Sequence, residues 1–133
     1  MKRRGLLDSF AVLAWIQDES GADRVEGLLT QAQRRKVPLL LGVINLGEVY
    51  YRLARQHGHP FAEEIIRQLQ TLPLQLYPCD DGLALAAAKI KTDFPMAYAD
   101  AIAVAIAQRE DAVIVTGDPE FAKVEHLVTV DWL

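Results

Sequence analysis

The chain has 133 residues, of which 51% are hydrophobic and 24% are charged; this fits one globular domain spanning residues 1–133. Its formal net charge of -4 excludes a protein that coats nucleic acid through bulk positive charge, although an enzyme with an acidic site can still act on nucleic acid. The single cysteine, Cys79, excludes an internal disulfide and a zinc site built from several cysteines, and it favours a reducing cytoplasm.

The first expected element is a short strand that ends at Asp8, within the segment "GLLD" at residues 5–8. The first 17 residues begin with basic side chains and continue with an apolar run, as a secretion signal does. However, Asp8 interrupts that run and no small-residue cleavage site follows. No segment reaches the ~20 apolar residues of a membrane span. We therefore expect a cytoplasmic protein that does not associate with a membrane.

Helices and buried strands alternate along the rest of the chain. Apolar residues at helical spacing predict helices at residues 9–19, 21–36, 45–57, 60–72, 82–94 and 96–111. Short apolar runs predict further strands at residues 38–44, 74–78, 112–118 and 127–130. This alternation, with few hairpin signals, predicts an α/β fold. We expect a three-layer α/β/α sandwich with a mainly parallel central sheet.

Four carboxylates fall where the predicted strands end or the predicted helices begin. Asp8 ends the first strand, and Asp118 follows the strand "VIVTG". Glu48 is expected in the first turn of the helix after residues 38–44, and Asp100 in the first turn of the alanine-rich helix. In an open parallel sheet, the carboxyl ends of the strands and the helix starts that follow them share one edge. We therefore expect the four acids to converge there.

Each acid also has a purely structural interpretation. Asp8 and Asp118 suit helix N-caps, and Asn45 with Glu48 resembles a capping box, while Glu48 could also pair with Arg52 one turn later. Taken together, however, the acids repel: two charges ~5 Å apart cost roughly 3 kcal/mol at an effective dielectric constant of about 20. A bound cation or protonation must offset this repulsion.

The expected cofactor is Mg²⁺, with Mn²⁺ as a substitute, because both ions prefer oxygen ligands. Zinc is disfavoured because the histidines, His57, His59 and His126, fall at a helix end and in loops. Carboxylates that hold such an ion commonly serve the hydrolysis of phosphodiesters or phosphate esters. A small-molecule phosphatase is the weaker alternative, because the segment "DSF" supplies only one acid where an Asp-x-Asp pair is typical.

Four segments resemble, in order and spacing, the acidic motifs of PIN-domain ribonucleases, and most closely the VapC-type toxins. The segments are "LLDSFAVLAW", "INLGEVYYRLAR", "YADAIAVAIA" and "VIVTGDPEF", and the similarity extends over nearly the whole chain. The resemblance implies that Asp8, Glu48, Asp100 and Asp118 are catalytic and bind the metal, with Asp8 and Asp100 as direct ligands. It also implies supporting roles for Ser9 and Thr116. Arg52 is a candidate RNA contact because it lies one turn from Glu48.

The same resemblance implies a function and a set of partners. A VapC-type toxin is an endoribonuclease that cuts transfer or ribosomal RNA, usually forms a homodimer and is neutralised by a VapB-type antitoxin. Operator DNA is bound only through the antitoxin. The alternative from a different class is a catalytically inactive PIN-fold module that only binds another protein.

Overall fold

The computed structural model describes residues 3–133 and contains one five-stranded sheet with the order β3-β2-β1-β4-β5. The strands are β1 (Gly5–Leu7), β2 (Leu39–Gly42), β3 (Leu74–Tyr77), β4 (Val113–Thr116) and β5 (Val130–Trp132). Every neighbouring pair is parallel. The predicted parallel sheet is therefore confirmed. Met1 and Lys2, where the segment considered as a secretion signal begins, lie outside the described residues.

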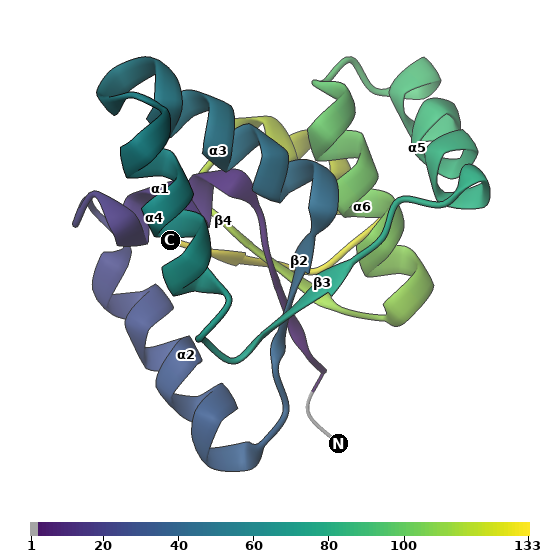
Figure 1. Cartoon of the computed structure of the whole chain (residues 1–133). Coiled ribbons are helices and arrows are strands. Elements are labelled where there is room, and N and C mark those ends of the chain that lie inside the picture. The colour runs from purple at the N-terminus through teal and green to yellow at the C-terminus, as the bar shows by residue number, and fades with distance from the viewer. Residues whose placement is uncertain (1–2) are drawn as a thin grey trace.

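Helices cover both faces of the sheet and produce the expected three layers (Figure 1). They are α1 (Ser9–Ile16), α2 (Ala22–Arg35), α3 (Val43–His57), α4 (His59–Leu69), α5 (Asp81–Asp93), α6 (Tyr98–Glu110) and the 3-10 helix η1 (Pro119–Val124). Alternate strand residues point to opposite faces: Leu6 packs with α5, α6 and η1, whereas Leu7 packs with α1 to α4. No helix within residues 3–133 is both long enough and apolar enough to cross a membrane.

Helix α6 is the most deeply buried helix, and its position explains its unusual composition. All residues from Asp100 to Ala107 are buried, because α6 packs between the sheet and α5. A helix enclosed in this way needs no polar stripe. Asp100 is the only ionisable residue in that buried stretch, so its burial requires an electrostatic explanation.

The strand order places a topological switch beside β1. The chain moves from β1 to β2 and then to β3 on one side, whereas β4 pairs with β1 on the other side. In open α/β sheets, ligands bind in the crevice at the carboxyl ends of the strands where the order reverses. Asp8 directly follows β1, and Asp118 lies two residues beyond β4. Both acids therefore stand at the switch.

The predicted strand over residues 38–44 is too long. β2 ends at Gly42 and α3 begins at Val43, where the side chains of Val43 and Ile44 are about 40% exposed. Periodicity alone does not separate a short buried strand from the start of a helix. The predicted capping box is also wrong: Gly42 is the N-cap without a side-chain hydrogen bond, and Glu48 lies beyond the first turn of α3.

The last strand is displaced from its predicted position at residues 127–130. β5 runs from Val130 to Trp132, while Leu127 and Val128 follow η1 as irregular chain. Their side chains are apolar because they pack against the core formed with α6, not because their backbone belongs to the sheet.

Candidate active site

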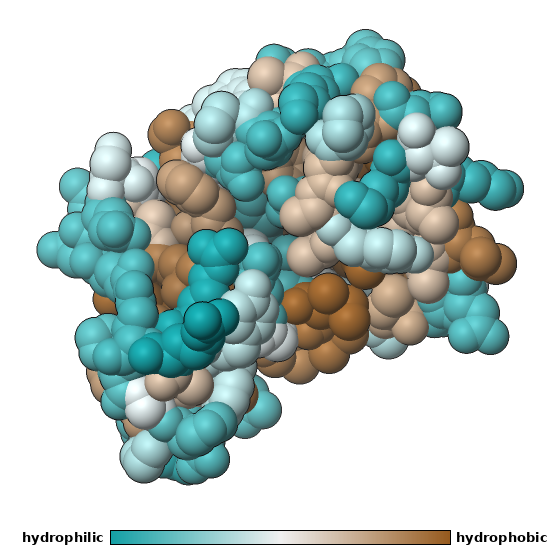
Figure 2. All heavy atoms as spheres, turned by 90° about the horizontal axis from the view of Figure 1, so that it is seen from above, coloured by the Kyte–Doolittle hydropathy of each residue, from teal (hydrophilic) through white to brown (hydrophobic). Residues whose placement is uncertain are grey.

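A cavity of about 540 Å³ lies at the edge of the sheet where β1 and β4 end. Its lining includes all four acids predicted from the sequence, namely Asp8, Glu48, Asp100 and Asp118. Ser9 and Arg52 also line the cavity. Figure 2 shows the molecule of Figure 1 from above, toward the carboxyl ends of the strands. Hydrophilic side chains cover most of this face, and hydrophobic side chains are exposed between them. The fold thus brings together four acids that are distant in sequence.

Asp8 is held rigidly at the base of the cavity. It is the N-cap of α1, and its Oδ1 accepts a hydrogen bond of 2.9 Å from the backbone N–H of Ala11. Its Oδ2 accepts a second bond, of 2.5 Å, from the hydroxyl of Thr116. The side chain is 1% exposed. Asp8 therefore caps α1 and also lines the cavity. The two roles are compatible because α1 begins at the edge of the sheet where the cavity lies.

A chain of hydrogen bonds positions Glu48. The Asn45 side-chain amide donates to the Ser9 hydroxyl at 3.4 Å, and that hydroxyl donates to Oε1 of Glu48. Arg52 binds Oε2 of Glu48 at 3.3 Å, as the spacing of one helical turn predicts. Ser9 therefore orients a carboxylate of the cavity, although it does so for Glu48 and not for Asp8.

Thr116 links Asp8 to Asp118. Its hydroxyl donates to Asp8 and accepts a hydrogen bond of 3.0 Å from the backbone N–H of Asp118. The Asp118 side chain accepts 3.0 Å from the backbone N–H of Glu120 and so caps η1. Gly117, between Thr116 and Asp118, leaves room for the ring of Phe10, since a Cβ at Gly117 would lie 2.3 Å from a ring carbon. Only glycine allows that close approach.

The lining of the cavity carries an excess of negative charge, with Arg52 as its one positively charged side chain. Burial raises the pKa of the Asp8 carboxyl to about 7, against hydrogen bonds from Thr116 and Ala11 that lower it, and the charges of Asp100 and Asp118 raise it further. Burial likewise raises the pKa of Asp100 to about 6, and the charges of Asp118, Glu48 and Glu120 add to the effect. Carboxyls with such raised pKa values are common at functional sites.

Thr116→Val is expected to raise the pKa of Asp8 above about 7, because the lost hydroxyl stabilises the ionised carboxylate. The measurement is a titration of the Asp8 carboxyl carbon by NMR in metal-free protein. Ser9→Ala is the matched control, since the Ser9 hydroxyl bonds Glu48 instead. An Asp8 pKa that is unchanged or lowered in Thr116→Val would contradict the assigned role of the hydroxyl.

The donor atoms of the cavity suit a hard divalent cation. Apart from Arg52, the ionisable side chains that line it are carboxylates, and the raised pKa values of Asp8 and Asp100 indicate that a cation would relieve unfavourable charge. Within residues 3–133, no three Asp, Glu, His or Cys side chains form a group that could hold a metal ion. Mg²⁺ does not require one, because it is usually held by one or two carboxylates and retains several waters.

Sequence reasoning underestimated two residues of this site. Asn45, considered only as a capping residue, is fully buried, and its Oδ1 has no hydrogen-bond partner within the described residues. Its burial behind Ser9 follows from the packing of α1 against α3, so no local signal in the sequence marked it. Glu120 lines the cavity and forms an ion pair with Lys123; its position directly after Asp118 and Pro119 was the available signal.

Comparisons with known proteins agree with this geometry. A family model described as "PIN domain" matches residues 5–127. Among solved structures, VapBC2 from Rickettsia felis bound to promoter DNA matches with a TM-score of 0.75 and 14% identity, covering 96% of each chain. DNA-bound VapBC from Salmonella typhimurium matches with a TM-score of 0.74 and 13% identity, covering 98% of each chain.

A third structure, the sarcin-ricin loop cleaving toxin VapC20 from Mycobacterium tuberculosis, has a TM-score of 0.68 and 14% identity. That match covers 89% of this chain and 92% of VapC20. A search of curated proteins gave no significant match. The parallel sheet, the acidic cavity at its switch point and a family match over nearly all residues lead to one conclusion: the chain belongs to the PIN domain family.

Proposed function

We propose that the protein is an endoribonuclease toxin that hydrolyses phosphodiester bonds of transfer or ribosomal RNA in the cytoplasm, with Mg²⁺, or Mn²⁺ in its place, as cofactor. One observation carries the proposal: four carboxylates from four separate segments line a single cavity at the switch point of a PIN domain. The likeness to a solved toxin that cleaves the sarcin-ricin loop supports RNA as the substrate class.

Asp8 and Asp100 are the proposed direct ligands, because they are the two most buried acids of the cavity. Glu48 and Asp118 would complete the site or hold ordered water. A divalent cation bound there would polarise the scissile phosphate and neutralise the charge that develops on it. The protein's own contribution is orientation: Thr116 fixes Asp8, and Ser9 fixes Glu48. A carboxylate not bound to the cation can accept the proton of the attacking water.

Arg52 is the proposed contact to the RNA backbone. Its side chain is 56% exposed at the rim of the cavity and pairs with Glu48 at 3.3 Å. A guanidinium in this position can turn toward a phosphate when the substrate arrives, because arginine binds phosphate oxygens with paired donors.

A VapB-type antitoxin is the proposed partner. Solved structures with the same fold come from VapBC complexes, and two of them are bound to DNA. Phe10 and Tyr51 are 43% and 47% exposed; Phe10 lines the acidic cavity, which favours a partner segment with apolar and basic side chains. The net charge of -4 makes direct binding of operator DNA by this chain unfavourable, so DNA contact would pass through the antitoxin.

We also propose a homodimer, with exposed residues of α3 such as Ile44 as candidate contacts.

RNA cleavage by the purified chain tests the proposal. The protein, freed of metal with EDTA, is incubated with total cellular RNA, and the new RNA ends are sequenced. We expect defined cuts with Mg²⁺ or Mn²⁺ and no cuts in EDTA. Asp100→Asn, prepared identically, controls for contaminating ribonucleases. Asp93→Asn changes an exposed acid that does not line the cavity, so this variant should cleave as the unchanged protein does.

The alternative, a PIN fold that only binds a protein, predicts a different result. Such a module would show no metal-dependent cuts, or cuts of equal strength with Asp100→Asn. Either outcome would contradict the proposed nuclease. The retained acids argue against this alternative, because without a cation they leave Asp8 and Asp100 with strongly raised pKa values.

A further inference from the structure

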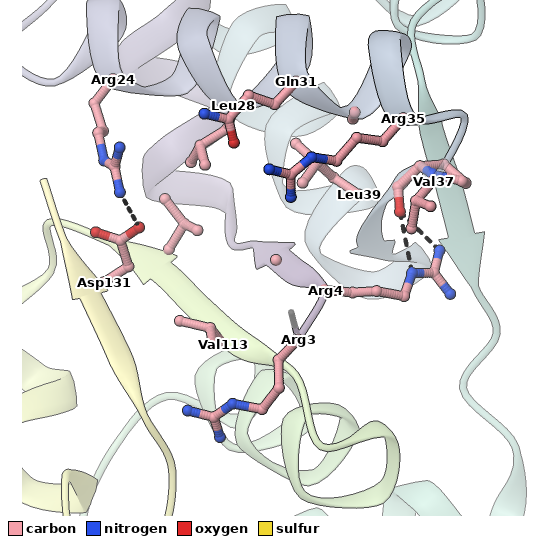
Figure 3. A pocket seen from close by; sticks show the side chains of 14 residues that line it. Arg3, Arg4, Arg24, Leu28, Gln31, Arg35, Val37, Leu39, Val113 and Asp131 are labelled. Carbon is pink, nitrogen blue, oxygen red and sulfur yellow. Dashed lines mark hydrogen bonds and ion pairs between the residues drawn. The ribbon is translucent and has the colours of Figure 1, made fainter. Parts of the chain in front are cut away.

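A second cavity lies at the opposite end of the strands from the acidic site. It has a volume of about 500 Å³ and lies between α2 and the beginnings of β1, β2 and β4, where Gly5, Leu39 and Val113 line it (Figure 3). Its volume falls within the range of about 300–1,000 Å³ that is typical of small-molecule sites. None of the four proposed catalytic acids lines it.

The charge of this cavity is opposite to that of the acidic site. Four arginines line it, Arg3, Arg4, Arg24 and Arg35, against one carboxylate, Asp131. The lining thus carries a formal excess of three positive charges in a chain whose net charge is -4. Such a local concentration of guanidinium groups attracts a ligand with several negative charges.

The arginines differ in how far the protein itself occupies them. Arg4 donates to the carbonyl oxygen of Pro38 at 2.8 and 3.1 Å, and Arg24 is paired with Asp131 at 2.7 Å. The guanidinium groups of these two arginines are therefore already occupied by contacts within the protein. Arg3 makes exposed contacts, 2.8 Å to the hydroxyl of Thr129 and 3.4 Å to Asp111.

Arg35 is the arginine available to a ligand. Within residues 3–133 it forms no ion pair and no side-chain hydrogen bond, and Figure 3 shows its guanidinium extending from the end of α2 into the cavity. A guanidinium presents paired donors that match the oxygens of a phosphate group.

The floor of the cavity is apolar. Leu39 and Val113 line it from the strands, and Leu28 covers it from α2, between Arg24 and Arg35 (Figure 3). Inorganic phosphate would leave this apolar surface unused, whereas a ligand with a planar ring and a charged group would use both parts. An acidic peptide fits less well, because its carboxylates each carry one charge and are spread along the chain, while a diphosphate concentrates its charge.

We propose that this cavity binds a nucleotide, with its phosphates on Arg35 and its base between Leu28 and Val113. The site shares no residue with the acidic cavity and requires neither RNA cleavage nor a divalent cation. Its failure or success is therefore separate from that of the proposed nuclease.

Calorimetric titration of the full chain with ADP in EDTA tests the proposal. EDTA prevents a metal ion from carrying the nucleotide to the acidic cavity. We expect ADP to bind more tightly than inorganic phosphate or adenosine. Arg35→Gln should weaken ADP binding about tenfold or more, since it removes charge-assisted hydrogen bonds. Arg34→Gln is the matched control: Arg34 is an exposed arginine in the same last turn of α2 but does not line the cavity.

Backbone amide shifts locate the bound ADP. We expect the largest changes at Leu28 and Val113 and little change around Asp8 and Asp100. No binding of ADP at millimolar concentration would overturn the proposal. So would equal weakening by Arg34→Gln, equally tight binding of citrate, or amide shifts confined to the acidic cavity.

Discussion

Asp8→Asn is expected to stabilise the metal-free protein at pH 8 while it reduces RNA cleavage by roughly 100-fold or more. The stabilisation follows from the pKa of Asp8, which burial raises from 3.8 to about 7 in the folded state. Forcing this carboxyl to ionise at pH 8 costs at most about 4 kcal/mol of the free energy of unfolding. Asparagine carries no charge and remains a good N-cap for α1.

The pH dependence of this effect has a definite sign. A raised pKa means that the folded state binds a proton between about pH 4 and pH 7 that the unfolded state has released. Asp8 therefore contributes full stability below its unfolded pKa, and that contribution is lost as the pH rises through about 7. The raised pKa of Asp100, about 6, acts in the same direction. The advantage of Asp8→Asn should consequently shrink from pH 8 to pH 5.

Urea unfolding of both proteins in EDTA at pH 5 and pH 8 measures the difference. Asp93→Asn serves as the control, because it removes an exposed carboxylate that does not line the cavity. Asp8→Asn could instead be no more stable than the unchanged protein at pH 8, or its advantage could be independent of pH. Either result would show that the pKa of Asp8 is not raised in the folded protein.

Mg²⁺ is expected to raise the melting temperature of the unchanged protein and to have little effect on Asp100→Asn. A ligand present at a hundredfold excess over its Kd stabilises the folded state by about 2.7 kcal/mol. For a domain of this size, that corresponds to a shift of about 5–10 °C. Asp100→Asn removes one of the two proposed direct ligands, so the shift should largely disappear.

The stabilisation by Mg²⁺ should be larger at pH 8 than at pH 5.5. Below the raised pKa values of Asp8 and Asp100, the cation must displace protons before it binds. Calorimetric melting with and without Mg²⁺ at the two pH values gives the comparison, and Asp93→Asn should respond like the unchanged protein. An equal shift in Asp100→Asn would place the cation elsewhere.

Local sequence signals predicted the secondary structure well where one residue decided the boundary. Asp8 is the N-cap of α1, as predicted, because a carboxylate accepts the free backbone N–H groups of a helix start. Val43 and Ile44 were assigned to the wrong element because nothing nearby marks the end of β2. Their place depends on which side chains the sheet can bury, and this is a tertiary property.

The candidate site was predicted from a rule of topology applied to local features. Acids at strand ends and helix starts share an edge in any open parallel sheet, so Asp8, Glu48, Asp100 and Asp118 could be grouped before their coordinates were known. The hydrogen bonds that orient them could not. Ser9 bonds Glu48, and Thr116 bonds Asp8, because packing of α1 against α3 and of β4 against β1 sets those distances.

By itself, the sequence determined the alternation of strands and helices and the positions of the four acids, because periodicity, capping and strand ends act over a few residues. Only the tertiary structure decided that Asn45 is buried behind Ser9 and that arginines from two segments gather over an apolar floor at the far end of the sheet. Both depend on contacts between residues that are far apart in the chain. Because such patterns of burial and charge arise only when the chain packs, neighbouring residues in the sequence do not reveal them.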